Sequence, residues 1–388
     1  MNIGVLRELE PGERRVAATP ESVRQLAGAG LSVTVEAGAG AAAGYPDAEY
    51  SEAGASIAES IPLEAIEVLA HVRPLRPELA ASLKAGSITV GLGSPASSLP
   101  TVEALRSAGV TSFALELVPR ISRAQSMDAL TSQALVAGYR CVLEAAMRLP
   151  RFFPLFMTAA GTIPPAKVLV LGAGVAGLQA IATAKRLGAR VSANDVREAS
   201  ADEVRSMGGT FISLDLGTAD AAGGYAKELA EDRAARQREL LTPHVSDSDI
   251  VITTAAIPGR AAPRLVTAEM LQGMRPGSVV IDLAAETGGN VEGSIAGVDT
   301  RVTLPGGGEI TIVGMKDVAS TMPYDASRLY AKNVANLVTL MTQEGAVQPD
   351  FDDEIVAGAC LTHAGEVRHA PTREALDVAE PAATKGAS

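Results

Sequence analysis

A glycine-rich turn in the middle of the chain constrains the fold more than any other segment. Its residues are Gly172, Ala173, Gly174, Val175, Ala176 and Gly177. An apolar, strand-forming run at 167–171 precedes it, and a helical pattern over 180–187 follows it. In such a turn Gly172 permits the tight bend, Gly174 lets the backbone approach a pyrophosphate, and Gly177 lets the helix pack closely on the strand. Because free N–H groups at the helix N-terminus then face the phosphates, the segment predicts a dinucleotide site.

An acidic residue at the end of the next strand completes this pattern. The run 190–194 predicts a strand, and Asp195 follows it, 23 residues after Gly172. A carboxylate here accepts hydrogen bonds from the adenosine ribose and repels a 2′-phosphate, so we expect NAD rather than NADP. Val196 and Arg197 come next and join the predicted site. Arg197 could offset the repulsion, although a solvated charge at the entry to a helix is the simpler explanation.

The composition is that of a globular protein with two domains of ordinary size. Of the 388 residues, 47% are hydrophobic and 20% are charged. A net charge of −12 argues against nucleic acid as a general partner. Cys141 and Cys360 lie in apolar segments without metal-ligand spacing, so we expect reduced core thiols, no metal site and a cytoplasmic location. We expect no signal peptide and no membrane-spanning segment.

Strand and helix patterns alternate along the chain. In its first part, strands are expected near residues 3–6, 31–36, 66–71, 87–91 and 111–115. In its second part, they are expected near residues 167–171, 190–194, 210–213, 249–253, 278–282 and 310–313. Such alternation is the signature of parallel, doubly wound sheets. We therefore predict an α/β protein with two doubly wound, Rossmann-like domains and a cleft between them.

Two long helical patterns set the expected domain boundaries. Residues 127–147 contain one glycine and no proline, which predicts a helix that links the domains. Residues 324–341 predict a second long helix, which we expect to return to the first domain. We expect a discontinuous outer domain at residues 1–126 and about 320–380. An NAD-binding domain is expected at residues 127–319, and a disordered tail at residues 370–388.

Polar residues crowd the segment before the first long helix. Between 119 and 133 the chain carries arginine, glutamine, aspartate, serine and threonine side chains. Ser126 is placed to cap the helix, and Asp128, in the expected first turn, suits the helix dipole. Capping would explain these two residues by itself. The large number of hydrogen-bond donors and acceptors in so short a segment indicates instead a surface that binds an amide and a ribose.

Four motifs together resemble one family. They are the run Arg-Ile-Ser-Arg-Ala-Gln-Ser-Met-Asp at 120–128, the glycine turn, Ala-Gly-Gly-Tyr-Ala-Lys-Glu at 222–228, and Thr-Thr-Ala-Ala-Ile-Pro-Gly at 253–259. With them, about residues 1–370 resemble the NAD(H)-binding component of proton-translocating nicotinamide nucleotide transhydrogenase, which is related to alanine dehydrogenase. The first and third motifs are specific to the transhydrogenase branch. The run 13–20 is shared with alanine dehydrogenases.

The resemblance implies roles for individual residues. The nicotinamide carboxamide and its ribose would be surrounded by Arg120, Gln125, Asp128 and Thr131, the expected catalytic residues. The family usually has serine at position 131, and threonine keeps the hydroxyl while its methyl group could shift the contact. Tyr225 resembles the tyrosine of a mobile loop that closes over bound nucleotide, although the acidic stretch at 215–220 is shorter than usual and an ordinary loop aromatic is the alternative. Ala255, in a turn beside the expected cleft, is counted among the cofactor contacts.

The proton-handling groups of an alanine dehydrogenase are missing. That enzyme must move a proton as well as a hydride and must hold a carboxylate. Related alanine dehydrogenases use a lysine in a Lys-Glu-Pro turn and a histidine at the end of the following strand. Here the first turn reads His71-Val72-Arg73-Pro74, and the strand that ends at 90–94 has no histidine. Arg15 could still bind a carboxylate, but a structural ion pair explains it equally well, and a strand-end histidine such as His71 is more often structural.

Hydride transfer between two nicotinamide rings needs no acid or base, because C4 of one ring gives hydride directly to C4 of the other. The resemblance therefore implies an NAD(P) transhydrogenase of the proton-translocating (Re/Si) type and not the Si-specific type. This chain would bind NAD(H), while a partner subunit would hold NADP(H) and a separate membrane-spanning subunit would move protons. The family also implies a homodimer, peripheral on the cytoplasmic, inner face of the membrane and active only with its partner subunits.

Three alternatives remain open. The first is an alanine dehydrogenase-like, NAD-dependent amino-acid dehydrogenase, which turnover of an oxo acid would reveal. The second is an NAD-sensing module that transfers no hydride with any partner. The third is a dehydrogenase for another small substrate that uses His71 or Arg15.

Overall fold

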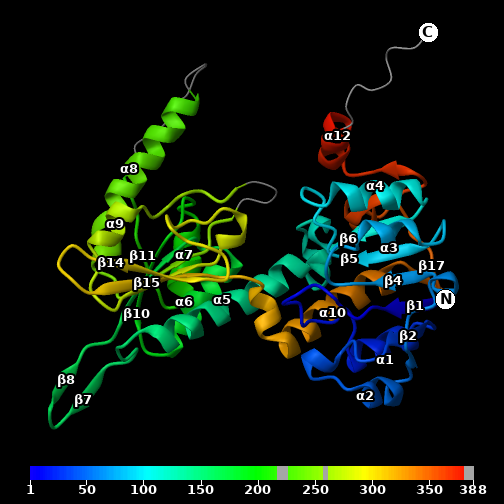
Figure 1. Cartoon of the computed structure of the whole chain (residues 1–388), viewed down its shortest axis with the longest axis horizontal. Coiled ribbons are helices and arrows are strands. Elements are labelled where there is room, and N and C mark those ends of the chain that lie inside the picture. The colour runs from blue at the N-terminus through cyan, green and yellow to red at the C-terminus, as the bar shows by residue number, and fades with distance from the viewer. Residues whose placement is uncertain (216–225, 257–260, 380–388) are drawn as a thin grey trace. The chain divides into compact units, whose positions relative to one another are not determined.

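The chain folds into two compact units. The computed structural model describes residues 1–215, 226–256 and 261–379 (Figure 1). Met1–Gln133 together with Ala319–Ser388 forms the first unit, and Ala134–Val318 forms the second. The first unit is therefore discontinuous in sequence, and the second is inserted into it. Among the described residues, no helix is long and apolar enough to cross a membrane.

The first unit is built on an eight-stranded sheet in the order β19-β18-β6-β5-β4-β1-β2-β3. The strands are β1 (Asn2–Val5), β2 (Ser32–Glu36), β3 (Ser56–Ala58), β4 (Val68–Ala70), β5 (Ile88–Gly91), β6 (Thr111–Ala114), β18 (Cys360–His363) and β19 (Glu366–Val367). From β3 to β6 all neighbours are parallel, whereas β18 and β19 are antiparallel. Because the strand order reverses between β1 and β4, this is the switch point at which doubly wound sheets bind ligands.

Helices cover both faces of this first sheet. They are α1 (Pro20–Gly28), α2 (Asp47–Glu52), α3 (Pro77–Ala81), α4 (Leu99–Ser107), α10 (Pro323–Leu340), α11 (Glu354–Ala359) and α12 (Ala370–Ala379), and a small separate hairpin joins β16 (Thr342–Gln343) to β17 (Ala346–Val347) (Figure 1). Side chains of α1, α10 and α11 share one apolar core with β1, whereas α3 and α4 share another with Leu69 of β4. The helix α10 lies where a long helix is expected over 324–341 and packs on the first sheet, as predicted.

The second unit has a seven-stranded sheet in the order β11-β10-β9-β12-β13-β15-β14. Its strands are β9 (Lys167–Leu171), β10 (Arg190–Asn194), β11 (Thr210–Phe211), β12 (Ile250–Thr253), β13 (Val279–Asp282), β14 (Asp299–Thr303) and β15 (Glu309–Gly314). All pairs are parallel except β14 with β15. Apart from the added edge strand β14, this is the strand order 3-2-1-4-5-6 of a dinucleotide-binding sheet, with its switch point between β9 and β12.

Alternate residues of the second sheet enter two different cores, so both of its faces are buried. The helices are α5 (Ala129–Arg148), which begins in the first unit, α6 (Val175–Arg186), α7 (Ser200–Ser206), α8 (Ala226–Ser246) and α9 (Ala268–Gln272), and a projecting hairpin joins β7 (Phe156–Thr158) to β8 (Gly161–Ile163) (Figure 1). Val168 and Val170 of β9 pack with α5 and α6, whereas Leu169 and Leu171 pack with α8 and α9. A parallel sheet buried on both faces accounts for the continuous apolar strand sequences.

The structure departs from expectation at the sheet edges and in the tail. Each expected strand is present, but the two large sheets carry additional strands at their ends: the antiparallel strands β14, β18 and β19 and the short strand β3. The expectation of a disordered tail from residue 370 is wrong for 370–379, which form α12. Thr372 is buried in this helix, and Leu376 packs against the cluster of Val367 and Leu361. Tertiary packing therefore orders a segment whose composition alone indicated disorder.

Candidate nucleotide site

The glycine turn joins β9 to α6 at the switch point of the second unit. Gly172 has φ 102°, a left-handed conformation in which glycine carries no steric penalty. A Cβ atom on Gly177 would lie 1.9 Å from the carbonyl oxygen of Gly172, so the first turn of α6 can sit against β9 only with glycine here. At Gly174, by contrast, a Cβ atom would have no neighbour within 4 Å.

The N-terminus of α6 is suited to an anion. Gly174 is the N-cap residue, so no side chain caps the first turn, and the exposed Val175 and half-buried Ala176 follow it. The N–H groups of the first turn have no partner within a helix, and the helix dipole adds a partial positive charge there. This open space above uncapped N–H groups fits a pyrophosphate.

Asp195 directly follows β10, and protein donors surround its carboxylate. Its side chain is 8% exposed; Oδ2 accepts from the N–H of Ala173 at 2.7 Å, and Oδ1 accepts from the N–H and Nε of Arg197 at 2.9 and 3.1 Å. Burial alone would raise the pKa of Asp195, but the hydrogen bonds from Arg197 and Ala173 outweigh it and lower the pKa. The Arg197 side chain is 59% exposed and pairs with Asp195 beside the glycine turn. Val196, between them, is exposed.

A second turn, after β12, touches the glycine turn. The N–H of Thr254 donates to the carbonyl of Leu171 at 2.9 Å, and the Thr254 hydroxyl donates to the carbonyl of Gly172 at 3.1 Å. Ala255 follows and is half-buried. The structure thus brings Ala255 to the same switch point as the glycine turn, by contacts that the sequence does not reveal.

The residues predicted to surround the nicotinamide carboxamide and its ribose lie on one short segment of the first unit. Arg120 is exposed, Gln125 is exposed on a 3₁₀ helix over Ser122–Met127, and Thr131 is exposed in the first turn of α5. Asp128 is half-buried between the two helices. The segment therefore places the four side chains near one another along the chain.

The cap of α5 differs from expectation. Asp128, and not Ser126, precedes the first helical residue, and its Oδ1 accepts from the N–H of Thr131 at 2.9 Å. Its Oδ2 accepts from the Thr131 hydroxyl at 2.6 Å. Ser126 remains in the 3₁₀ helix, where its carbonyl accepts from Asn333 and Asn336 of α10 at 2.9 and 3.0 Å. The 3₁₀ turn shifts the helix start toward the C-terminus, so the aspartate is the cap.

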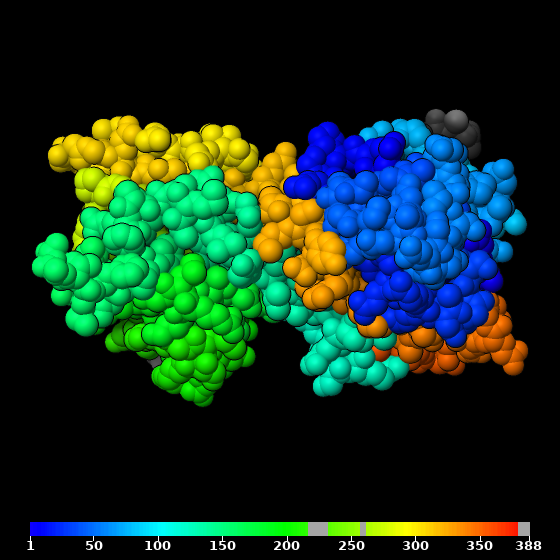
Figure 2. Space-filling view, turned by 90° about the horizontal axis from the view of Figure 1, so that it is seen from below, coloured from blue at the N-terminus to red at the C-terminus, as the bar shows by residue number. Residues whose placement is uncertain are grey.

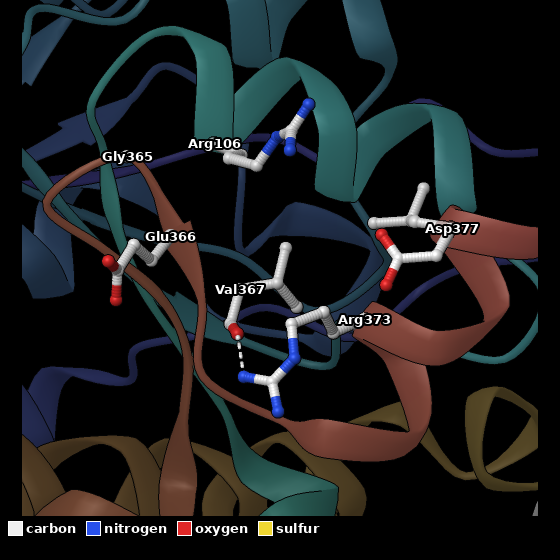
Figure 3. Close-up of a pocket in the computed structure, with 7 residues that line it drawn as sticks. Arg106, Gly365, Glu366, Val367, Arg373 and Asp377 are labelled. Carbon is white, nitrogen blue, oxygen red and sulfur yellow. Dashed lines mark hydrogen bonds between the residues drawn. The ribbon is translucent and has the colours of Figure 1, made fainter. Parts of the chain in front are cut away.

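Tyr225 lies outside the described residues. A cavity of about 290 Å³ in the first unit lies between α4, β19 and α12, lined by Arg106, Gly365, Glu366, Val367, Arg373, Leu376 and Asp377 (Figure 3). Arginine and acidic side chains are balanced around it, so its chemistry favours no ligand class. Among the described residues, no group of three metal-ligating side chains could hold a metal ion.

The switch point of the first unit holds a buried ion-pair network. The Glu13 carboxylate is fully buried; it pairs with Arg15 at 2.7 Å and Arg73 at 2.6 Å and accepts from the Ser320 hydroxyl. Arg15 also donates to Gln133 at 2.9 Å. Burial alone would raise the pKa of Glu13, but the hydrogen bonds and charge of Arg15 outweigh it and lower the pKa to about 2. Arg15 is therefore engaged by a carboxylate of its own chain.

His71 directly follows β4 and is buried. It is 4% exposed, and its Nδ1 lies 2.6 Å from the carbonyl oxygen of Arg73. Burial lowers the pKa of His71 to about 4, so the ring is neutral and Nδ1–H donates to that carbonyl. A Cβ atom on Gly91 would lie 2.5 Å from ring atoms of His71. The enclosed, neutral ring has neither the exposure nor the charge of a proton donor to substrate.

We expect Glu8 to make the stability of the first unit depend on pH. Burial raises the pKa of Glu8 to about 7, with the N–H of Val72 opposing the shift and the Glu13 carboxylate adding to it. The folded form therefore favours the neutral acid, and the free energy of unfolding should fall as the pH rises from 4.5 through 7, by about 3 kcal/mol for a shift of this size.

We expect Glu8→Gln, which keeps an acceptor for Val72, to remove this decline. The variant should therefore melt at a higher temperature than the parent at pH 8 but not at pH 5. The exposed Glu10→Gln is the charge-matched control, and an equal gain in both variants would contradict the assignment.

Two family models match consecutive parts of the chain. The family model "alanine dehydrogenase/PNT, N-terminal domain" matches residues 4–137, and "alanine dehydrogenase/PNT, C-terminal domain" matches residues 141–370. An NAD(P) transhydrogenase alpha-subunit protein of Rhodospirillum rubrum is 46% identical over 381 residues, which are 95% of this chain and 98% of the relative. An alanine dehydrogenase of Halomonas elongata is 28% identical and covers 97% of each chain.

The solved structures agree with the sequence comparison. The transhydrogenase crystal structure from Sinorhizobium meliloti matches with a TM-score of 0.82 and 44% identity, over 95% of this chain and 98% of that one. The similarity to transhydrogenase subunits is thus much greater in sequence than the similarity to alanine dehydrogenase. Both domain models and nearly full-length relatives lead to one conclusion: the chain belongs to the alanine dehydrogenase/PNT family, in the branch of the NAD(P) transhydrogenase alpha subunits.

Proposed function

We propose that the chain is the NAD(H)-binding subunit of a proton-translocating NAD(P) transhydrogenase of the Re/Si type. Bound NADH supplies the hydride, which passes from C4 of its ring to NADP⁺ held by a partner subunit, while a separate membrane-spanning subunit moves protons. The subunit then acts as a peripheral protein on the inner face of the membrane. The near full-length similarity to a transhydrogenase subunit of Rhodospirillum rubrum supports this proposal.

One observation carries the proposal. The glycine turn has all three glycines of the dinucleotide-binding pattern, whereas the side chains that a dehydrogenase would use on its substrate are engaged within the protein. Arg15 is paired with buried Glu13, and His71 is neutral and enclosed. Direct hydride transfer needs only that the rings be held in contact and water excluded, so this site needs no acid or base. The same observation disfavours an alanine dehydrogenase-like activity.

The residues assigned to the nucleotide have separate tasks. The glycine turn binds the pyrophosphate, and Asp195 accepts from the adenosine ribose. Arg120, Gln125, Asp128 and Thr131 hold the nicotinamide carboxamide and its ribose. Because Asp128 already accepts from Thr131, the Thr131 oxygen is left with lone pairs that can accept from the carboxamide N–H₂.

Asp195→Ala should weaken NADH binding by about tenfold and leave NADPH binding unchanged or stronger. The carboxylate that accepts from the ribose is lost, and Arg197, released from its ion pair at 3.1 Å, can approach a 2′-phosphate. Fluorescence titration with both nucleotides measures the ratio. The exposed Asp202→Ala is the charge-matched control. Equal losses for NADH and NADPH would refute the assignment of Asp195 to the ribose.

The proposal is tested by NADH oxidation with pyruvate and ammonium, with binding followed in the same cuvette by NADH fluorescence. Binding without turnover is the expected result. The same chain mixed with an NADP(H)-binding transhydrogenase subunit should then reduce NADP⁺ from NADH. Turnover with pyruvate would establish the dehydrogenase function instead, and binding without transfer to any partner subunit would leave an NAD-sensing module.

An exposed apolar surface on the second unit supports a homodimer. The hairpin β7–β8 projects from the unit (Figures 1 and 2). All six of its strand residues are exposed. Its strands carry the exposed apolar side chains Phe156, Met157 and Ile163, and the exposed Phe152 and Leu155 come shortly before it in the chain. Leu135, Tyr139 and Met147 are exposed along α5 at multiples of four residues, which aligns them as a ridge. An isolated two-stranded hairpin is marginally stable in water, so a second copy of the same two surfaces is the proposed cover.

Met157→Glu should convert the dimer to a monomer without loss of NADH binding. The Met157 side chain is 79% exposed in the free chain, and a charge there would be buried without a partner in the dimer. Light scattering after gel filtration measures the mass. Val378→Glu, at an 86% exposed position of α12, is the control. A parent chain that is monomeric at micromolar concentration, or a variant that stays dimeric, would contradict the proposed interface.

A further inference from the structure

Asn290 is a fully buried polar residue in the loop after β13, and its side chain holds the backbone of Ala255. Its Oδ1 accepts from the N–H of Ala255 at 3.1 Å. Its Nδ2 donates to the carbonyls of Ala255 and Pro263, each at 2.8 Å. One amide therefore satisfies both polar groups of Ala255, as a neighbouring strand would, and uses three of its four hydrogen-bonding positions.

The position of Asn290 is itself fixed by the sheet. Its N–H donates to Asp282, the last residue of β13, at 3.2 Å, and its carbonyl accepts from Leu265 and Val266 at 2.8 and 3.0 Å. Asp282 is fully buried and also accepts from the N–H of Val291 at 3.1 Å. Because β13 is an interior strand, the Asn290 amide has little freedom to move.

Ala255 in turn is tied to the glycine turn through Thr254, whose hydroxyl donates to the carbonyl of Gly172. A Cβ atom on Gly172 would lie 2.7 Å from that hydroxyl oxygen, so the two turns are in direct contact. The hydrogen bonds form one path from β13 through Asp282, Asn290 and Ala255 to the edge of the nucleotide site.

We propose that Asn290 is a positioning residue for the nicotinamide half of the bound dinucleotide. In a sheet of this order, the half that begins with β9 takes the adenosine nucleotide, and the half that begins with β12 takes the other nucleotide. Ala255 is the second residue of the loop after β12, and its N–H and C=O are engaged by Asn290. It therefore offers the ring a wall of fixed position, and its N–H is already engaged. This inference rests on the proposed function, since it takes NAD(H) to lie across this switch point.

The test compares binding of 5′-AMP with binding of NADH to the full chain. Asn290→Ala should raise the dissociation constant of NADH by about tenfold and change that of 5′-AMP by less than about twofold. A residue that merely supports the fold would affect both ligands in proportion. Glu292→Gln, an exposed change in the same loop that keeps the acceptor for the N–H of Ala268, is the matched control.

Asn290→Asp provides a second test, because aspartate has nearly the shape of asparagine and leaves no empty space as alanine would. Its carboxylate keeps the acceptor for Ala255 but turns negative charge toward the carbonyls of Ala255 and Pro263. Protonation restores one donor, so NADH affinity of this variant should recover as the pH falls from 8 to 6. The parent chain and Asn290→Ala should show no such recovery.

The outcomes separate this inference from the proposed function. A parent chain that binds neither 5′-AMP nor NADH would overturn the proposed function. A parent chain that binds both, with variants that lose both equally or lose neither, would overturn the role of Asn290 alone. A variant that does not fold would assign Asn290 to the stability of the whole unit, unless Asn290→Asp folds and shows the pH-dependent recovery.

Discussion

Gly174→Ala should leave the melting temperature of the chain unchanged and weaken NADH binding by about a hundredfold, or roughly 2.7 kcal/mol. The first half of this expectation follows from the empty space around the residue, where a Cβ atom would meet no atom within 4 Å, and from its φ of −75°. The second half follows from the ligand, because the methyl group would occupy the space in which a pyrophosphate meets the N–H groups of α6. Calorimetry of the free chain and fluorescence titration with NADH measure the two halves separately.

Two further glycines serve as controls for this prediction. Gly177→Ala places a Cβ atom 1.9 Å from the carbonyl oxygen of Gly172, so it should lower the melting temperature as well as the affinity. Gly28→Ala, in α1, meets no atom within 4 Å, so it should leave the affinity unchanged and should not lower the melting temperature. If Gly174→Ala binds NADH as the parent does, the phosphates do not approach Gly174, and the assignment of the turn fails.

The contrast between these glycines shows which part of the fold can be predicted. The turn at 172–177 is a local signal, since the strand, the bend and the helix follow one another in sequence. The parallel strands have continuous apolar sequences because both faces are buried, so their places are clear as well. The edge strand β14 has alternate half-buried and exposed residues and no such run. The helix α12 depends on contacts with β18 and β19, which a tail composition does not reveal.

The candidate site also has residues that the sequence predicts and residues that it does not. The acid at the end of β10 is predictable because its distance from Gly172 is part of the motif, but that spacing does not reveal its ion pair with Arg197. Sequence reasoning misses Asn290 entirely. It stands in a Gly-Gly-Asn loop that is typical of a turn, and its partner Ala255 lies 35 positions away. The signal that could point to it is the acid at the end of β13, Asp282, which organises that loop.

Gln125→Asn should slow hydride transfer by about a hundredfold, since a displacement of about 1 Å at a reacting ring is enough for a loss of that size. Gln125 is exposed on the short 3₁₀ helix before α5, and a carboxamide is the natural partner of another carboxamide. Asparagine retains both the donor and the acceptor but withdraws them by one methylene group. The affinity for NADH should change by less than about threefold, because the pyrophosphate and adenosine contacts stay intact.

Rapid-mixing measurement of NADP⁺ reduction, with an NADP(H)-binding transhydrogenase subunit added in excess, gives the transfer rate, and fluorescence gives the affinity. The neighbouring Ser122→Ala, on the same helix, should change neither quantity and so controls for disturbance of the helix. A rate and an affinity that fall together would mean that Gln125 contributes binding energy to ground state and transition state alike. A rate that falls alone would mean that Gln125 orients the ring, which is all that a hydride transfer without acid or base requires of a protein.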